Sequence, residues 1–238
     1  SDISLKQIDS LLDPKTFTIT TAHQCNLFLG PAYTIYKALH TIKLADELNR
    51  SMPGHHFVPV FWMGSEDADL PELNHTYVQD KRWEWKTTQS GAVGRMKVDG
   101  GVISLIDGLE QELLRYQHGS QWIQILRDSY EIGRPVAECS FRMLHALFAD
   151  RGLIVLQPDD AQLKLVMQEV FWQELAAPVA QKLVEVSDQQ LRKAGFKPQA
   201  HARAINLFYL LDGVRARIEQ DGSDWVADGT VKIGRAHV

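Results

Sequence analysis

The chain has 238 residues, of which 45% are hydrophobic, so it can bury a sizeable core as one large or two small domains. Its formal net charge of −5 argues against nucleic-acid binding, which needs a basic face, and no apolar run approaches the length of a bilayer span. The two cysteines, Cys25 and Cys139, rule out a disulfide framework and fit a reducing compartment. We therefore expect a cytoplasmic protein that binds neither nucleic acid nor membrane.

The first predicted unit is a strand, a polar turn and a helix. Residues 17–21 are rich in strand formers, and residues 33–48 carry apolar side chains at helical spacing. The turn between them contains His23, Gln24, Asn26, Gly30 and Pro31. In an open parallel sheet such a turn lies at the carboxyl edge of a strand, where these folds bind ligands. The unpaired backbone N–H groups at the start of the helix suit an anion such as phosphate.

A second strand and an acidic turn follow. Residues 56–63 form a continuous apolar run, as expected for a strand covered on both faces. The polar residues after it are Ser65, Glu66, Asp67, Asp69, Asn74 and His75. Because a right-handed crossover makes the two strands parallel, both turns should open on the same edge of the sheet. The pattern predicts one shared site with an anion-binding side and a side that holds a cation, an amine or a ribose.

The rest of the chain predicts an inserted segment and a return to α/β structure. Residues 77–86 alternate apolar with polar, and glycines at 91, 94, 100 and 101 suggest a small β element such as a hairpin. Helical patterns cover residues 104–116, 121–131, 136–150, 161–175 and 179–193. Short strands are expected at 153–156, 203–211 and 214–219, with turns at 212–213 and 221–222. Asp159 and Asp160 are expected to cap the helix that follows them.

Four blocks of sequence, in this order, resemble the bacillithiol-biosynthesis cysteine-adding enzymes, the cysteine ligase BshC family. They are TAHQ-x-N-L-F-x-GP-x-YTIYK, VPVFW-x-x-SED-x-D-x-x-E-x-NH, residues 152–160 and residues 203–213. The resemblance runs from about residue 17 to residue 225. It implies an α/β fold: a Rossmann-like parallel sheet laid out as in class I aminoacyl-tRNA synthetases, with an inserted mixed α/β connecting segment. It also implies a C-terminal coiled coil that this chain does not contain.

The resemblance further implies an enzyme that joins L-cysteine to glucosaminyl-malate through an amide bond, and a full-length homodimer. Amide formation needs a leaving group on the cysteine carboxyl, so ATP use is chemically reasonable. Mg²⁺ is an alternative to an amine as the counter-charge of the acidic turn, and no residue is assigned as a metal ligand. Two other classes remain open, a nucleotidyltransferase of the same fold and a non-catalytic small-molecule binding module, because fold does not fix chemistry.

The expected layout has four parts. Residues 1–75 are the first part of the Rossmann-like core, 76–151 the inserted segment, and 152–232 the continuation of the core with a hairpin. Residues 233–238 resemble the peptide encoded by a read-through sequencing adapter and are expected to be an artefact. Since members of the family are about twice as long, we expect this chain to be a fragment that is inactive by itself.

Functional roles are expected in the two turns. The candidates for the chemistry are His23, Gln24, Asp67 and Asp69. The candidates for binding substrate or nucleotide are Thr21, Asn26, Gly30, Pro31, Tyr33, Lys37, Ser65, Glu66, Asn74 and His75. A neutral imidazole can donate to a phosphate oxygen or take a proton from an amine. Three neighbouring carboxylates repel one another unless an amine, a cation or hydrogen-bond donors compensate.

Each candidate also has a structural interpretation. His23 and Gln24 could cap the helix or pair with loop backbone, and Gly30 with Pro31 could only shape a turn. Lys37 and the carboxylates could be solvated, Asn74 could be a helix cap and His75 a loop histidine. Cys25 is interpreted as incidental and Cys139 as a core residue on a helix face, while Asn206 and Tyr209 are expected to be structural.

Overall fold

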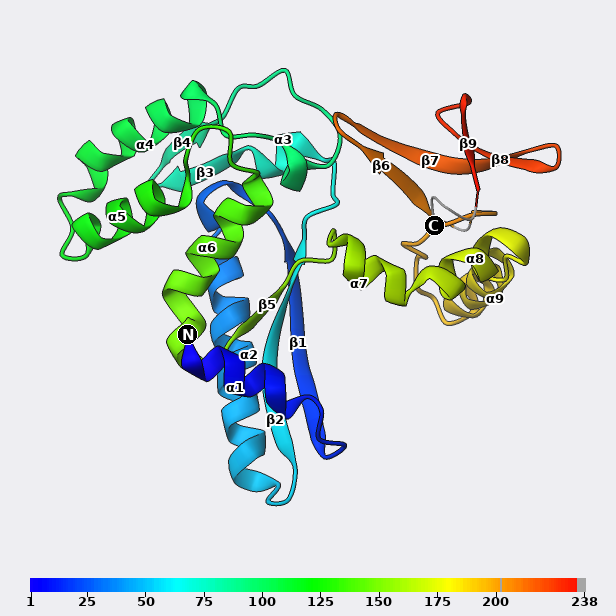
Figure 1. Ribbon diagram of the computed structural model, residues 1–238, viewed down its shortest axis with the longest axis horizontal. Helices are drawn as coiled ribbons and strands as arrows, with labels where there is room; N and C mark the ends of the chain where they lie inside the picture. The colour runs from blue at the N-terminus through cyan, green and yellow to red at the C-terminus, as the bar shows by residue number, and fades with distance from the viewer. Residues whose placement is uncertain (202, 235–238) are drawn as a thin grey trace. The chain divides into compact units, whose positions relative to one another are not determined.

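A computed structural model describes residues 1–201 and 203–234, and the chain divides into two compact units, Ser1–Pro158 and Asp159–Val238 (Figure 1). The sequence analysis placed no boundary between residues 158 and 159. Each unit is described by itself.

The first unit contains a three-stranded parallel sheet in the order β1-β2-β5. The strands are β1 (Thr16–Gln24), β2 (His56–Gly64) and β5 (Ile154–Leu156). The central strand β2 is almost wholly buried, as its continuous apolar run predicts. The crossover helix α2 (Tyr33–Ser51) packs on β1 and β2. The strand–helix–strand prediction and the parallel pairing are confirmed, and the fold is Rossmann-like.

The turn between β1 and α2 differs from the expected polar loop. A buried 3₁₀ turn, η1 (Leu27–Leu29), fills its middle with apolar side chains. Helix α2 has no side-chain cap, so the interpretation of His23 and Gln24 as helix caps is wrong. The sequence pattern missed η1 because three consecutive apolar residues have neither helical nor strand periodicity.

The connecting segment between β2 and β5, residues 65–153, contains a hairpin and a group of helices. Its elements are α3 (Leu70–Leu73), β3 (His75–Val78), β4 (Lys81–Glu84), η2 (Val93–Arg95), α4 (Gly100–Leu113), α5 (Gly119–Ser129), α6 (Val136–Phe148) and η3 (Ala149–Arg151). The hairpin β3–β4 is antiparallel and begins at His75, two residues before the expected stretch, and the glycines at 91, 94, 100 and 101 are outside it. Gly100 and Gly101 instead begin α4, because the carboxylate of Asp99 accepts hydrogen bonds from the N–H groups of Gly101 and Val102.

One hydrophobic core joins the sheet, η1 and the helices α4–α6. Its fully buried members include Phe61, Trp85, Ile106 and Met143. Burial of each large apolar side chain contributes about 1.5–3 kcal/mol, so this cluster is the main source of stability in the unit. Cys139 is completely buried in α6, which confirms its interpretation as a core residue. Helix α1 (Asp2–Ser10) contacts β5 and η3.

The second unit consists of helices followed by an antiparallel sheet in the order β6-β7-β8-β9. Its elements are α7 (Ala161–Val166), α8 (Gln168–Ala176), α9 (Ala180–Lys193), β6 (Phe208–Leu211), β7 (Val214–Asp221), β8 (Asp224–Ala227) and β9 (Val231–Ile233). The expected hairpins at 212–213 and 221–222 are confirmed. Strand β6 is shorter than expected, because Asn206 is bonded instead to the carboxylate of Glu174. Tyr209 lies in β6 and packs against the core of this unit.

Two further predictions concern the ends of this unit. Asp160 caps α7 by accepting hydrogen bonds from the N–H groups of Gln162 and Leu163, as expected. In the segment interpreted as an adapter artefact, Ile233 pairs with Trp225 in β9, and residues 235–238 lie outside the described residues. Across the described part of the chain, none of the helices has the length and apolar character needed to cross a bilayer.

Candidate functional site

The two predicted turns leave the sheet at the same carboxyl edge. In the parallel register His23 lies opposite Met63 and Gln24 opposite Gly64. His23 and Gln24, which were expected in the turn, are the last two residues of β1. Gln24 Nε2 donates to Asp67 Oδ2 over 2.9 Å, so a side-chain hydrogen bond joins the end of β1 directly to the acidic turn. The topology that the sequence predicted is therefore present, and Gln24 makes the link to the acidic turn.

His23 lies against the beginning of α2. Its ring centroid is 4.9 Å from that of Tyr33, and Nε2 is buried with no hydrogen-bond partner among the described residues. Burial lowers the pKa of His23 below its ordinary value, and the nearby charge of Lys37 lowers it further, against a smaller opposing effect of the Gln24 side chain. The imidazole is therefore neutral at neutral pH and can accept or donate a proton at this edge.

Lys37 folds back over the end of β1. Its ammonium group donates to the carbonyl oxygen of Ala22 over 3.2 Å and lies 5.6 Å from the ring centroid of Tyr33. Lys37 is exposed, as a solvated side chain would be, and its functional role stays a prediction. His23, Tyr33 and Lys37 together place one positive charge and one neutral imidazole at the strand end, a combination suited to an anionic ligand.

The acidic turn is held by a segment that the sequence analysis did not single out. The N–H of Val93 donates to the carbonyl oxygen of Asp67 over 2.7 Å, and the N–H of Gly94 donates to that of Ser65 over 3.0 Å. A Cβ on Gly94 would lie 2.4 Å from the Ser65 carbonyl oxygen, so only glycine allows this approach. The signal in the sequence was Gly94 itself, which was interpreted as a hairpin glycine.

The carboxylates of the acidic turn have different surroundings. Asp67 accepts from Gln24 with one oxygen and from the N–H of Asp69 over 3.3 Å with the other. Glu66 is half-buried, and the exposed Asp69 precedes α3 without capping it through its side chain. Within residues 1–201 and 203–234 no three His, Cys, Asp or Glu residues are grouped as a metal site would require. Hydrogen-bond donors thus compensate part of the charge of Asp67.

Three of the six buried polar side-chain atoms that have no partner among the described residues belong to the two segments that meet at this edge. Among the described residues, Asn26 Oδ1 and Ser65 Oγ are buried without a hydrogen-bond partner, as is His23 Nε2. Buried polar groups of this kind normally bond to protein, water or a ligand. Their occurrence on residues 23, 26 and 65 favours an interpretation of this edge as a ligand site.

Other candidates have structural contacts. Gly30 packs so closely on Thr76 that a Cβ would lie 2.2 Å from its hydroxyl oxygen. The amide of Asn74 donates to the carbonyl oxygen of Trp85 over 3.0 Å, and His75 begins β3. Thr21 lies within β1 opposite Phe61, and Pro31 is exposed just before α2. Functional roles for these residues stay predictions.

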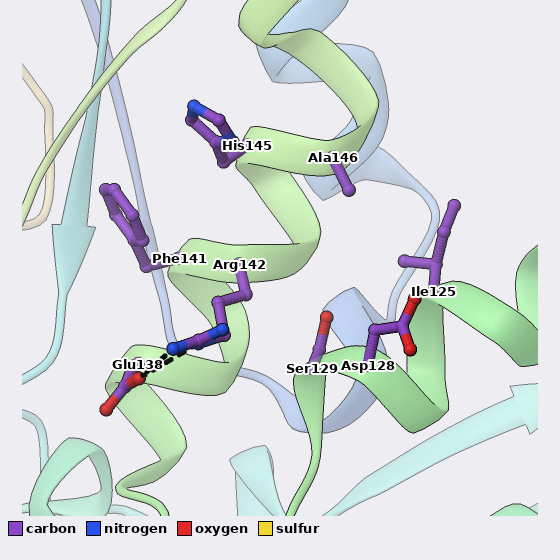
Figure 2. A pocket seen from close by; sticks show the side chains of 8 residues that line it. All are labelled: Ile125, Asp128, Ser129, Glu138, Phe141, Arg142, His145 and Ala146. Carbon is purple, nitrogen blue, oxygen red and sulfur yellow. Dashed lines mark hydrogen bonds and ion pairs between the residues drawn. The ribbon is translucent and has the colours of Figure 1, made fainter. Parts of the chain in front are cut away.

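A separate hollow of about 440 Å³ lies between α5 and α6, and none of the predicted site residues lines it (Figure 2). Its lining residues are Ile125, Asp128, Ser129, Glu138, Phe141, Arg142, His145 and Ala146. Within it, Arg142 is paired with Glu138 at 2.7 Å. Because that charge is already compensated and most of the lining side chains are exposed, the hollow has less to offer a ligand than the sheet edge.

The parallel sheet, the crossover helix and the polar turns at one carboxyl edge define a Rossmann-like α/β domain. The family model described as "Bacillithiol biosynthesis BshC, N-terminal Rossmann-like domain" matches residues 1–233. The chain belongs to this family.

Curated relatives agree with the family model. The chain is 38% identical over 221 residues to a protein of Cytophaga hutchinsonii, covering 93% of this chain and 40% of that protein. It is 35% identical to a protein of Flavobacterium johnsoniae, covering 92% of this chain and 41% of that protein. It is 33% identical to a protein of Chlorobaculum tepidum, covering 94% of this chain and 41% of that protein. All three bear the name "Putative cysteine ligase BshC". The chain thus spans about two fifths of the length of these relatives.

Proposed function

We propose that the whole protein joins L-cysteine to glucosaminyl-malate in bacillithiol biosynthesis, and that this domain supplies part of the ligation site. Membership of the BshC family and the names of the relatives support the proposal. The observation that carries it is the hydrogen bond between Gln24 and Asp67, which joins the end of β1 to the acidic turn at one edge of a parallel sheet. A reaction between a carboxyl group and an amine needs groups of both kinds close to the forming bond.

In this proposal the β1–α2 side of the edge holds the anionic group. The ammonium of Lys37 and the unpartnered Nε2 of His23 fit a phosphate or carboxylate oxygen. They also fit ATP, which would supply the leaving group on the cysteine carboxyl. No residue is assigned as a Mg²⁺ ligand, and no step is derived through that ion.

The acidic side of the edge holds the glucosaminyl amine. The exposed carboxylate of Asp69 attracts the ammonium form, and the amine must lose a proton before or during its attack on the cysteine carbonyl. His23 has a free ring nitrogen to accept that proton, because burial lowers its pKa and keeps the imidazole unprotonated at neutral pH. Gln24, bonded to Asp67, keeps the two turns in register while the amide forms.

The experiment is a ligation assay with the full-length protein encoded by the gene that contains this sequence. L-cysteine, glucosaminyl-malate and ATP are supplied together and singly omitted, and mass spectrometry follows the amide product and the nucleotide products. Formation of the amide only when both substrates are present is the expected result. Pyrophosphate with a nucleotidylated product and no amide would identify a nucleotidyltransferase, and ligand binding without any turnover would identify a binding module.

A further inference from the structure

The turn that follows β1 has an unusual backbone. Phe28 (φ 56°, ψ 29°) and Leu29 (φ 57°) are consecutive residues in the left-handed region, and neither is glycine. This conformation is unfavourable for bulky L-residues and persists only where the surroundings hold it in place. Both residues are buried, so the backbone N–H and C=O groups of this turn need hydrogen-bond partners within the protein instead of water.

Backbone groups within the turn do not satisfy the N–H of Phe28. The carbonyl oxygens of Asn26 and Leu27 accept from the N–H groups of Leu29 and Gly30, over 3.1 Å in each case. The N–H of Phe28 donates instead to the hydroxyl oxygen of Tyr130 over 3.0 Å. Tyr130 lies 102 residues further along the chain, directly after α5.

Tyr130 is built to act as this acceptor. Only 2% of its surface is exposed, and its ring meets that of Phe28 edge-on, with the centroids 4.9 Å apart. Burial raises the pKa of the Tyr130 hydroxyl, so it stays protonated and uncharged. One side chain thus supplies both a hydrogen-bond acceptor and an apolar contact to a residue in a costly conformation.

The position of this turn decides where the candidate site residues lie. The N–H of Asn26 donates to the carbonyl oxygen of Gln24 over 3.0 Å, so the turn begins at the residue that contacts Asp67. At its other end Gly30 packs against Thr76, immediately before α2. A turn that relaxed to a right-handed conformation would move Gln24, Asn26 and the start of α2 relative to one another.

We propose that Tyr130 is a positioning residue for ligation, which holds the β1–α2 turn in its left-handed conformation and thereby places Gln24 and Asn26 for the reaction. The inference rests on the proposed function. It adds a residue from the connecting segment that the sequence pattern does not mark.

The test uses Tyr130→Phe in the full-length protein, because this change removes only the hydroxyl and keeps the ring. Tyr116→Phe is the matched control, since the Tyr116 hydroxyl accepts a hydrogen bond from Gln79 on the exposed surface of the same segment. We expect the kcat for amide formation to fall about tenfold in Tyr130→Phe, with KM values changed less than twofold, because small misplacements slow the chemical step more than binding. Tyr116→Phe should retain the kcat of the wild type.

Hydrogen exchange gives a second readout that a merely stabilising role would not produce. Peptides spanning residues 24–31 should lose protection in Tyr130→Phe, while peptides from β2 keep theirs. Unchanged protection of the turn, or lost protection with an unchanged kcat, overturns the inference. Failure of the wild-type enzyme to form the amide overturns the proposed function instead, and the exchange data then still decide whether Tyr130 holds the turn.

Discussion

Replacement of Gly94 by alanine tests how the acidic turn is held. A Cβ at this position would lie 2.4 Å from the carbonyl oxygen of Ser65 and 2.7 Å from its Cβ. Both atoms belong to a buried residue at the end of β2, so they cannot move aside as the end of a flexible side chain could. Insertion of a methyl group into packed surroundings costs about 1–3 kcal/mol, and we expect the upper part of that range. For a unit of this size 1 kcal/mol corresponds to about 2–4 °C in Tm.

Gly100→Ala is the matched control, since a Cβ there meets nothing within 4 Å. It should be neutral or slightly stabilising, because alanine favours a helix over glycine by about 0.5–1 kcal/mol. Thermal unfolding of both variants of the full-length protein, followed by tryptophan fluorescence, measures the difference. In the ligation assay Gly94→Ala should also lower kcat, because a displacement of Ser65 by the added methyl group would displace the neighbouring Asp67 of the same turn. Equal Tm values for the two variants would refute the reasoning.

Four other substitutions test separate residues. The pKa of His23 in the folded state is lowered from its ordinary value of 6.5, so the unfolded state binds the proton more tightly and the protein should lose stability as the pH falls below 6.5. The urea midpoint should therefore fall less with pH in His23→Gln than in the wild type, and parallel pH profiles of the two proteins would contradict this. Asp160→Ala should destabilise the second unit by about 1 kcal/mol through loss of the α7 cap, measured by urea unfolding. Asp69→Asn should lower kcat/KM for ligation at least about tenfold, with the free energy of unfolding changed by less than about 0.5 kcal/mol. Asp67→Asn should lower kcat/KM as well, and should also lower the free energy of unfolding by about 1.5–3 kcal/mol because its carboxylate accepts hydrogen bonds. Retained activity per folded molecule would favour a structural role for both residues.

The parallel core could be predicted because its signal is local. The apolar run at residues 56–63 marks a strand covered on both faces, and the helical spacing after residue 33 marks the crossover. Handedness then fixes where both turns lie. The register that places Gln24 opposite Gly64 was not predicted and comes from the structure.

Other features depend on contacts that a single segment does not reveal. Gly100 and Gly101 look like turn residues, and only the two hydrogen bonds accepted by Asp99 make them the start of α4. Likewise, residues 203–207 were expected to belong to a strand, but the carboxylate of Glu174 binds Asn206 outside the sheet. The left-handed turn at Phe28 was unpredictable for the same reason, since its acceptor is 102 residues away.

These contacts assign a role to the connecting segment. Its η2 turn supplies the N–H groups of Val93 and Gly94 that hold the acidic turn, and its Tyr130 supplies the acceptor that holds the β1–α2 turn. The sheet brings the two turns to one edge, but the backbone of each is fixed by a residue of the inserted segment. Residues of the connecting segment therefore help to position both turns of the candidate site. Substitutions at Gly94 and Tyr130 should accordingly affect the same step of the reaction, although these residues belong to different elements.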